Sequence, residues 1–298
     1  MKYGGIHMVR KIFSHLHIYH KIILVFLLLM TPIYCANFCT SKSIRDFLQK
    51  ETTKSIMMNV NFCSEQLYNE ISLLKRQQYQ LINDKDVTNL AYMSNTMSIY
   101  EKQKGLDRIF RNIIHICDSS QFVEDVLVFI RPINYMITTK GISQFYINEL
   151  TSKLQLLKEE DHIYSDEQQN FLLMESNSDM KKVSLEERSI IIVIKINPNQ
   201  IKKMISRIVE GQDSGSLLVN SNTGFLVMSD EDMGMFTLIN SLVSDDNNIS
   251  FIRKINWQGD SYWIITHSVL YTNMTLVSWI SEHNITRFIR KYNILLII

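Results

Sequence analysis

Residues 126–138 read Val-Leu-Val-Phe-Ile-Arg-Pro-Ile-Asn-Tyr-Met-Ile-Thr, the clearest strand signal in the chain. The first five residues are apolar, as in a buried strand, whereas Arg131 to Asn134 has the composition of a turn. Residues 135–138 then return as a second strand. The segment therefore predicts a hairpin within an antiparallel sheet.

The residues after this hairpin predict a helix followed by two more strands. Apolar positions in residues 144–158 recur at helical spacing. Residues 170–174 and 189–196 have strand composition, and the polar segment between them predicts an excursion joining two strands. Asn197 and Pro198 are favoured at the N-cap and the first helical position, so we expect another helix to begin there.

A second set of strands follows in a similar order. Residues 217–219 and 225–228 predict a hairpin, and residues 235–243 a short helix. Three further strands are expected at residues 251–256, 261–269 and 275–281. The order predicts a five-stranded antiparallel sheet with its helices on one face. The fold class is therefore α+β, with two tandem PAS-like antiparallel-sheet units.

The N-terminal region predicts a membrane anchor. Residues 22–41 contain no charged side chain, and twenty helical residues span about 30 Å, the thickness of a bilayer core. Basic residues precede this segment and no acidic residue does. The positive-inside rule therefore places residues 1–21 in the cytoplasm and residues 42–290, approximately, outside. Bulky Tyr34 near the candidate cleavage site disfavours a cleaved signal peptide.

Residues 42–118 are expected to form a stalk and the helices of the first unit. Apolar residues recur there at steps of three and four, which predicts an amphipathic stalk helix of about 40 residues. Its apolar positions are Ile44, Leu48, Ile56, Val60, Cys63, Leu67, Ile71 and Leu74. Further helices are expected at residues 87–98 and 106–117. Such a stripe must pack on a domain or on a partner helix, so we expect a homodimer through the stalk.

The C-terminal residues 284–298 predict a helix that leads into a truncated second membrane segment. The last seven residues are apolar but too few to cross a bilayer. Arg287, Arg290 and Lys291 would lie outside the membrane, which opposes the positive-inside rule.

Composition and motifs exclude several functions. The net charge is +1 and no basic face is evident, so nucleic acid is not an expected partner. The sequence lacks P-loop, dinucleotide-binding, zinc-protease, CxxC and nucleophile-elbow motifs, so this chain predicts no enzyme, no cofactor and no metal site. Whether Cys63 and Cys117 form a disulfide is left open by the sequence.

The order of elements resembles the double Cache sensor domain of bacterial membrane receptors. The resemblance rests on residues 123–129 (VEDVLVF) with their return strand, on residues 217–220 with Gly224, and on residues 257–262 (WQGDSY). The chain is most similar to sensor histidine kinases of Gram-positive bacteria that often lie beside sugar-uptake systems. This implies a membrane-distal unit at 119–210, a membrane-proximal unit at 211–283 and a two-component signalling role.

The resemblance also implies a small solute bound outside the cell, in the distal unit. The candidate ligand-binding residues are Arg131, Tyr135, Tyr146 and Tyr164. The ligand is expected to be sugar-like or another small metabolite, because the Arg-x-Trp-Tyr sequence of the amino-acid-binding variant is missing. Alternatives are a chemoreceptor ectodomain, a membrane-tethered AraC-type regulator and a static anchored surface-binding protein.

Overall fold

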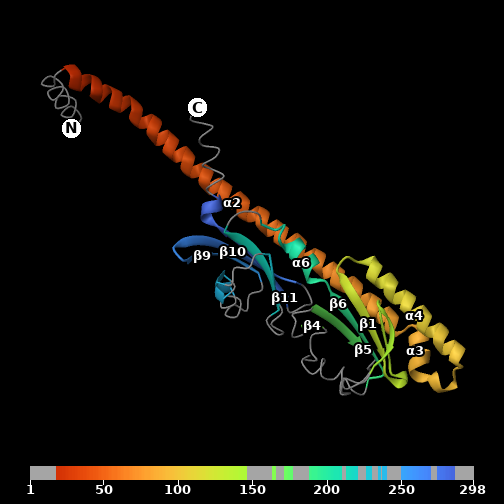
Figure 1. Ribbon diagram of the computed structural model, residues 1–298. Coiled ribbons are helices and arrows are strands. Elements are labelled where there is room, and N and C mark those ends of the chain that lie inside the picture. Colours follow the sequence, from red (N-terminus) through yellow and green to blue (C-terminus); the bar gives the residue numbers. More distant parts are fainter. Residues whose placement is uncertain are drawn as a thin grey trace. The chain divides into compact units, whose positions relative to one another are not determined.

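The structure is a computed structural model, and it combines long helices with two antiparallel sheets (Figure 1). It describes residues 18–145, 163–165, 171–176, 188–209, 213–220, 226–229, 234–235, 237–239, 250–269 and 274–285. Its contacts divide the chain into a large compact unit, residues 54–284, and a second unit formed by the residues outside that range. The helices are α2 (Ile18–Ile82), α3 (Lys85–Tyr92), α4 (Ile99–Ser119) and α6 (Pro198–Ile205), with short 3-10 turns η1 (Ser94–Thr96) and η2 (Arg131–Ile133).

The first sheet, sheet A, has the strand order β3-β2-β1-β6-β5-β4, and every neighbouring pair is antiparallel. Its strands are β1 (Val123–Ile130), β2 (Tyr135–Thr138), β3 (Gly141–Gln144), β4 (Ile163–Ser165), β5 (Phe171–Ser176) and β6 (Ile190–Ile196). The predicted hairpin is confirmed as β1 and β2. The short strands β3 and β4 were not predicted.

One expected helix in sheet A begins in the wrong place. Gln144 was predicted to start a helix, but it is the last residue of β3 and lies opposite Tyr135. Ladder hydrogen bonds to β2 outweigh the helical spacing of the apolar residues that follow. The remainder of that prediction, residues 146–158, lies outside the described residues.

The second sheet, sheet B, has the order β8-β7-β11-β10-β9, which confirms the predicted five-stranded antiparallel sheet. Its strands are β7 (Ser214–Asn220), β8 (Leu226–Met228), β9 (Phe251–Trp257), β10 (Asp260–Ser268) and β11 (Met274–Ser281). β9 and β10 are joined by Gln258 and Gly259, whose φ angles are 51° and 92°. Two consecutive residues with positive φ form the tight turn that matches the twist of a hairpin.

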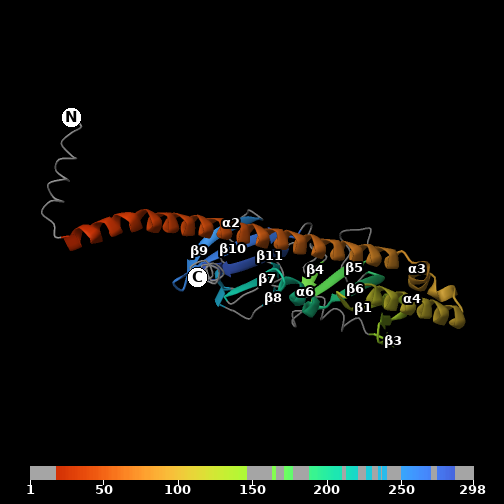
Figure 2. The same ribbon diagram turned by 90° about the horizontal axis from the view of Figure 1, so that it is seen from above.

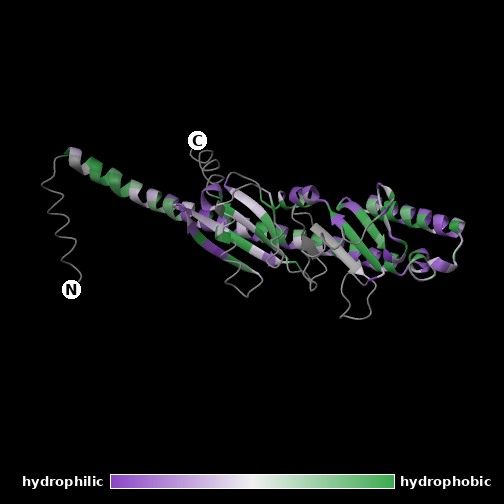
Figure 3. Ribbon diagram, turned by 60° about the horizontal axis from the view of Figure 1, so that its bottom comes forward, coloured by the Kyte–Doolittle hydropathy of each residue, from purple (hydrophilic) through white to green (hydrophobic). Residues whose placement is uncertain are grey.

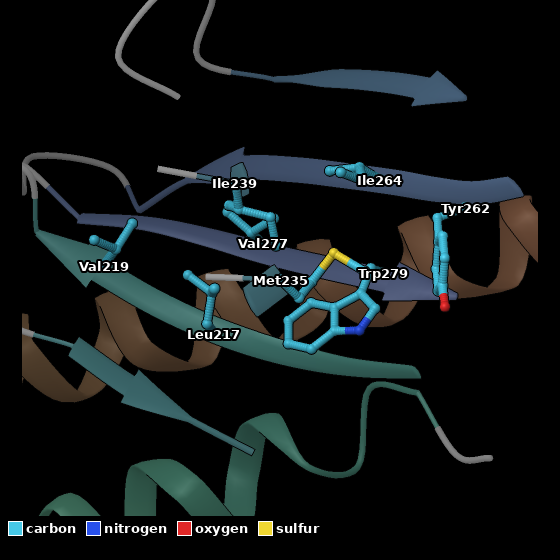
Figure 4. Close-up of a cluster of buried hydrophobic side chains, with 8 residues drawn as sticks. All are labelled: Leu217, Val219, Met235, Ile239, Tyr262, Ile264, Val277 and Trp279. Carbon is cyan, nitrogen blue, oxygen red and sulfur yellow. The ribbon is translucent and has the colours of Figure 1, made fainter. Parts of the chain in front are cut away.

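Sheet B packs around one large ring (Figure 4). Trp279 of β11 is 3% exposed and lies beside Met235, from the helical residues 234–235. The rest of the cluster comprises Leu217, Val219, Ile239, Tyr262, Ile264 and Val277. A Cβ added to Gly215 would meet Cζ2 of Trp279 at 2.5 Å. Glycine is therefore required where β7 passes under the indole.

Helix α2 contains the predicted apolar segment and the predicted stalk in one continuous element. It is 65 residues long, close to the twenty residues of the expected membrane segment plus the roughly 40 of the expected stalk, and it continues through Pro32. It is the one described helix that is long and apolar enough to cross a membrane. Figure 3 shows apolar residues at its beginning and mixed residues further along. No glycine or proline separates the two parts, so nothing in the sequence ends the helix between them.

The later part of α2 buries the predicted stripe. Six of its expected positions are buried, whereas Ile44 and Leu48 are half-buried. The buried residues are Ile56, Val60, Cys63, Leu67, Ile71 and Leu74. In both Figure 1 and Figure 2 this part of the helix runs past sheet B and then past sheet A.

Three side chains of α2 donate hydrogen bonds to backbone carbonyls of other elements. The Nδ2 atom of Asn59 donates to the carbonyl of Ile208, which follows α6, at 3.2 Å. Ser64 Oγ donates to the carbonyl of Ser268 in β10 at 3.2 Å. Gln78 Nε2 donates to Ile192 in β6 at 3.3 Å. One helix is thus bonded to both sheets and to the segment that joins them.

The helices after α2 begin at well-formed caps. Asp84 caps α3 by accepting from the backbone N–H groups of Asp86 and Val87. The predicted helix at residues 87–98 is wrong in its second half, because Ser98 and Glu101 form a capping box that starts α4 there. Cys63 in α2 and Cys117 in α4 are free thiols, which answers the disulfide question.

Candidate ligand-binding site

The β1–η2–β2 connection forms a rigid corner at one end of sheet A. Pro132 occupies the start of η2, and Asn134 follows it with a left-handed φ of 54°. The N–H of Asn134 donates to the carbonyl of Arg131 at 2.9 Å, and the carbonyl of Asn134 accepts from the N–H of Phe145 at 3.1 Å. Asparagine tolerates this conformation better than most residues, so the local sequence favours the corner.

Two of the four predicted site residues lie in or beside this connection. Arg131 is exposed in η2, and Tyr135 is half-buried at the first position of β2, opposite Ile130. Tyr146 lies outside the described residues. Tyr164 lies in β4, and its side chain is not described.

Tyr164 belongs to a different part of sheet A. Strands β1, β6 and β5 lie between β2 and β4 in the sheet order. At about 4.8 Å per strand, the backbones of β2 and β4 are roughly 19 Å apart. The structure therefore does not bring Tyr164 beside the Arg131–Tyr135 corner.

A further basic residue, Arg188, lies at the same end of sheet A and was missed by the sequence prediction. It immediately precedes Ser189, whose carbonyl accepts a 3.0 Å hydrogen bond from the N–H of Arg131. Arg188 Nη1 also donates to the Oγ of Ser176, at the end of β5, at 2.6 Å. A signal was available: Arg131 follows one buried strand and Arg188 precedes another, so antiparallel pairing brings them to one end.

The charged side chains at the opposite end of β1 and β2 bond to other residues of sheet A. Asp125 accepts from the N–H and the Oγ1 of Thr139 at 3.1 and 2.7 Å, which closes the β2–β3 turn onto β1. Glu124 forms an ion pair with Lys195 of β6 at 2.9 Å. These contacts fix the sheet, whereas the other end carries Arg131 and Tyr135 and also Arg188, whose guanidinium bonds to Ser176 on β5.

The described residues contain no group of three His, Cys, Asp or Glu side chains placed to hold a metal ion. Burial raises the pKa of the Cys63 thiol to about 12, so this cysteine is not an activated nucleophile.

Comparison with known proteins supports the architecture. No family model matches the sequence, and no curated protein matches it. Solved structures do match: the sensory domain of the Campylobacter jejuni chemoreceptor Tlp3 with isoleucine bound has a TM-score of 0.51 at 11% identity. The match covers 81% of this chain and 97% of that domain.

This chain shares the fold of these solved domains, with two antiparallel sheets beside long helices. The ligand-binding domain of Mlp24 with asparagine matches at a TM-score of 0.51 and 9% identity, over 83% of this chain and 99% of that one. The extracellular domain of the candidate histidine kinase vpHK1S-Z8 matches at 0.50 and 11%, over 81% and 95%. At such low identity, the likeness establishes the fold alone.

Proposed function

We propose that this chain is the ligand-sensing extracytoplasmic part of a membrane signalling receptor. The observation that carries the proposal is helix α2. The same helix contains the segment that is apolar enough to cross a membrane and the buried stripe that packs along the Cache-like sheets. A ligand that changes the packing of the sheets would therefore act on an element continuous with the membrane anchor.

We place ligand binding at the corner of sheet A, with Arg131, Tyr135 and Arg188 as contacts. Guanidinium groups and a tyrosine hydroxyl offer several hydrogen-bond donors, which suit a small polar solute. The expected ligand is sugar-like or another small metabolite. Carboxylate ligands are a second class to test, because guanidinium groups pair well with carboxylates.

The proposed output is a histidine kinase that follows this chain on the cytoplasmic side, with residues 1–21 also cytoplasmic. Its proposed assembly is a homodimer through α2. Phe47, Met58 and Tyr79 are exposed on this helix, at 65%, 53% and 67%, and helical periodicity puts them on the side opposite the buried stripe. In the proposed dimer, a partner helix would cover these separate apolar side chains.

The test is a thermal-shift screen of the full chain in nanodiscs against sugars, polyols, amino acids and other carboxylic acids. A ligand at 100 times its Kd stabilises a protein by about 2.7 kcal/mol, which gives a clear rise in Tm. We expect a hit to lose its shift in Arg131→Ala and in Arg188→Ala. Lys140→Ala is the control, because Lys140 is exposed beyond the opposite end of β2.

Two results would contradict the proposal. One is that every hit stabilises all three variants equally, which would leave no ligand at the corner. The other is that hits bind to the receptor but none of them changes the reactivity or mobility of spin labels placed on α2. That result would separate ligand binding from the helix.

A further inference from the structure

A groove separate from the distal corner lies where α2, the residues after α4 and helix α6 meet. Its volume is about 330 Å³, within the range of small-molecule sites. Gln66 of α2, Gln121 after α4 and Lys203 of α6 contribute to its walls. It lies beside the segment that connects sheet A to sheet B, since α6 follows β6 and precedes β7.

Hydrogen bonds hold the walls of this groove in place. Asn197, the N-cap of α6, donates its backbone N–H to the carbonyl of Phe122 at 2.8 Å. At the other end of α6, the carbonyl of Ile208 accepts from Asn59 of α2 at 3.2 Å. The groove is thus a preformed feature of the junction, because the α6 segment shares a direct bond with each of the other two walls.

The electrostatics of the groove favour an anion. Ile201 and Ile205 are buried against the sheets, so α6 turns Lys203 outward, and Arg207 four residues later is exposed too. Among the residues that line the groove there is no aspartate or glutamate. Within the described part of the chain, none of the ion pairs involves Lys203 or Arg207. The remaining polar lining consists of neutral amides.

The groove also offers apolar surface. Phe62 of α2 lines it and is 69% exposed, and Met204 of α6 lines it from the facing wall. An aromatic ring that is largely exposed beside two cations would be covered by a ligand with both a charge and an apolar body. Inorganic anions would satisfy the cations but would leave this apolar surface in water.

We propose that this junction groove binds a small organic carboxylate. Its carboxylate would lie against Lys203 and Arg207, and its apolar body against Phe62 and Met204. Because the walls belong to α2 and to the connection between the sheets, the bound anion would hold these elements together. The groove is therefore a second ligand site, independent of the corner of sheet A.

The experiment uses the full chain in zwitterionic nanodiscs, with Cys35, Cys39 and Cys117 replaced by serine. Cys63 lines the groove and is 4% exposed, so its labelling by a maleimide reports opening of the groove. We expect benzoate, added at constant ionic strength, to slow the labelling saturably by several-fold. Benzylamine lacks the negative charge and sulfate lacks the apolar body, so both should have little effect.

Lys203→Gln with Arg207→Gln should raise the benzoate concentration at half-effect at least tenfold. The control is Lys104→Gln with Arg111→Gln, which removes two charges from exposed positions of α4 and should leave the benzoate effect intact. Lys203→Gln alone provides a milder variant if the double variant misfolds. The proposal fails if benzoate has no effect, if sulfate or benzylamine equals it, or if the groove variants respond like wild type.

Discussion

Sheets A and B are both antiparallel, yet their interiors are built differently. The centre of sheet A is β6, an almost continuous run of isoleucine and valine that is buried on both faces. Sheet B is organised around Trp279, which fits over Gly215, and Trp257 approaches Tyr262 edge-on with ring centroids 6.0 Å apart. Sheet B also buries a hydrogen bond of 2.8 Å between the hydroxyls of Ser216 and Ser278.

This contrast separates two ways of stabilising a sheet. An aliphatic core tolerates exchange among side chains of similar volume, whereas a core built on one ring and one glycine depends on a particular fit. The polar groups differ in the same sense: sheet B satisfies Ser216 and Ser278 internally, while sheet A gathers Arg131 and Arg188 at its end. We therefore expect sheet B to be the structural base and sheet A the more variable, sensing half.

The largest expected effect is that of Trp279→Ala. Removing the ring loses its buried area and leaves a cavity over Gly215, which should lower the free energy of unfolding by about 3–5 kcal/mol. Urea unfolding of the full chain in nanodiscs, followed by circular dichroism, measures this. In sheet A, Ile192→Leu conserves volume and should cost less than about 1.5 kcal/mol. Equal losses in the two variants would remove the contrast between the sheets.

The two glycines Gly215 and Gly105 give a matched pair. In Gly215→Ala the new methyl group would meet Trp279 at 2.5 Å, so we expect a loss of about 1–3 kcal/mol from overpacking. In α4, the methyl group of Gly105→Ala would lie 3.5 Å from Leu90, an ordinary contact. Helix propensity should then stabilise this variant by about 0.5–1 kcal/mol. Thermal unfolding of both proteins tests the opposite signs.

The buried serine pair sharpens the comparison further. Ser278→Ala removes the hydroxyl that bonds to the buried hydroxyl of Ser216. The loss of this hydrogen bond should lower the free energy of unfolding by about 1–3 kcal/mol. The double variant Ser216→Ala with Ser278→Ala removes both groups and should recover part of this loss. A double-mutant cycle by urea unfolding gives the coupling energy. Additive losses would show that the pair contributes nothing specific.

The smallest effect is expected in the helices beside sheet A. A side-chain hydrogen bond from Arg108, assisted by its charge, holds the pKa of Asp86 below its ordinary value. Because the folded pKa is lowered, the contribution is complete above the unfolded pKa of about 3.9 and is lost as the pH falls through the folded pKa. The pair is partly exposed, so Asp86→Asn should cost less than about 1 kcal/mol near neutral pH. The difference in Tm between Asp86→Asn and wild type should narrow in acid. A difference that stays constant with pH would contradict this role of Asp86.

The sequence predicted best the elements that have strong local patterns. Clear turns separate the strand at residues 135–138 and the last three strands of sheet B from their neighbours. The predicted bounds of these strands are within one residue of the observed ones. β3 and β4 escaped because their four and three residues carry no such pattern, and pairing with β2 and β5 defines them. The break before Ser98 was missed although Ser98 and Glu101 have the spacing of a capping box, so this signal was present in the sequence.

The candidate sites were less predictable, for a different reason. Ser189 and Ser176 tie Arg188 to that end of sheet A, and the pairing of β5 with β6 determines this placement. The junction groove combines residues of α2 with residues of α6 that are more than 130 positions away. Neither set has a motif, since each of its members is ordinary in its own element.

The three hydrogen bonds from α2 to backbone carbonyls also limit how this helix can move. Advancing an α-helix by one residue shifts it about 1.5 Å and turns it by about 100°. A screw motion of that size would take Asn59, Ser64 and Gln78 away from their acceptors at the same time. The three bonds therefore resist a screw motion of α2 past the two sheets.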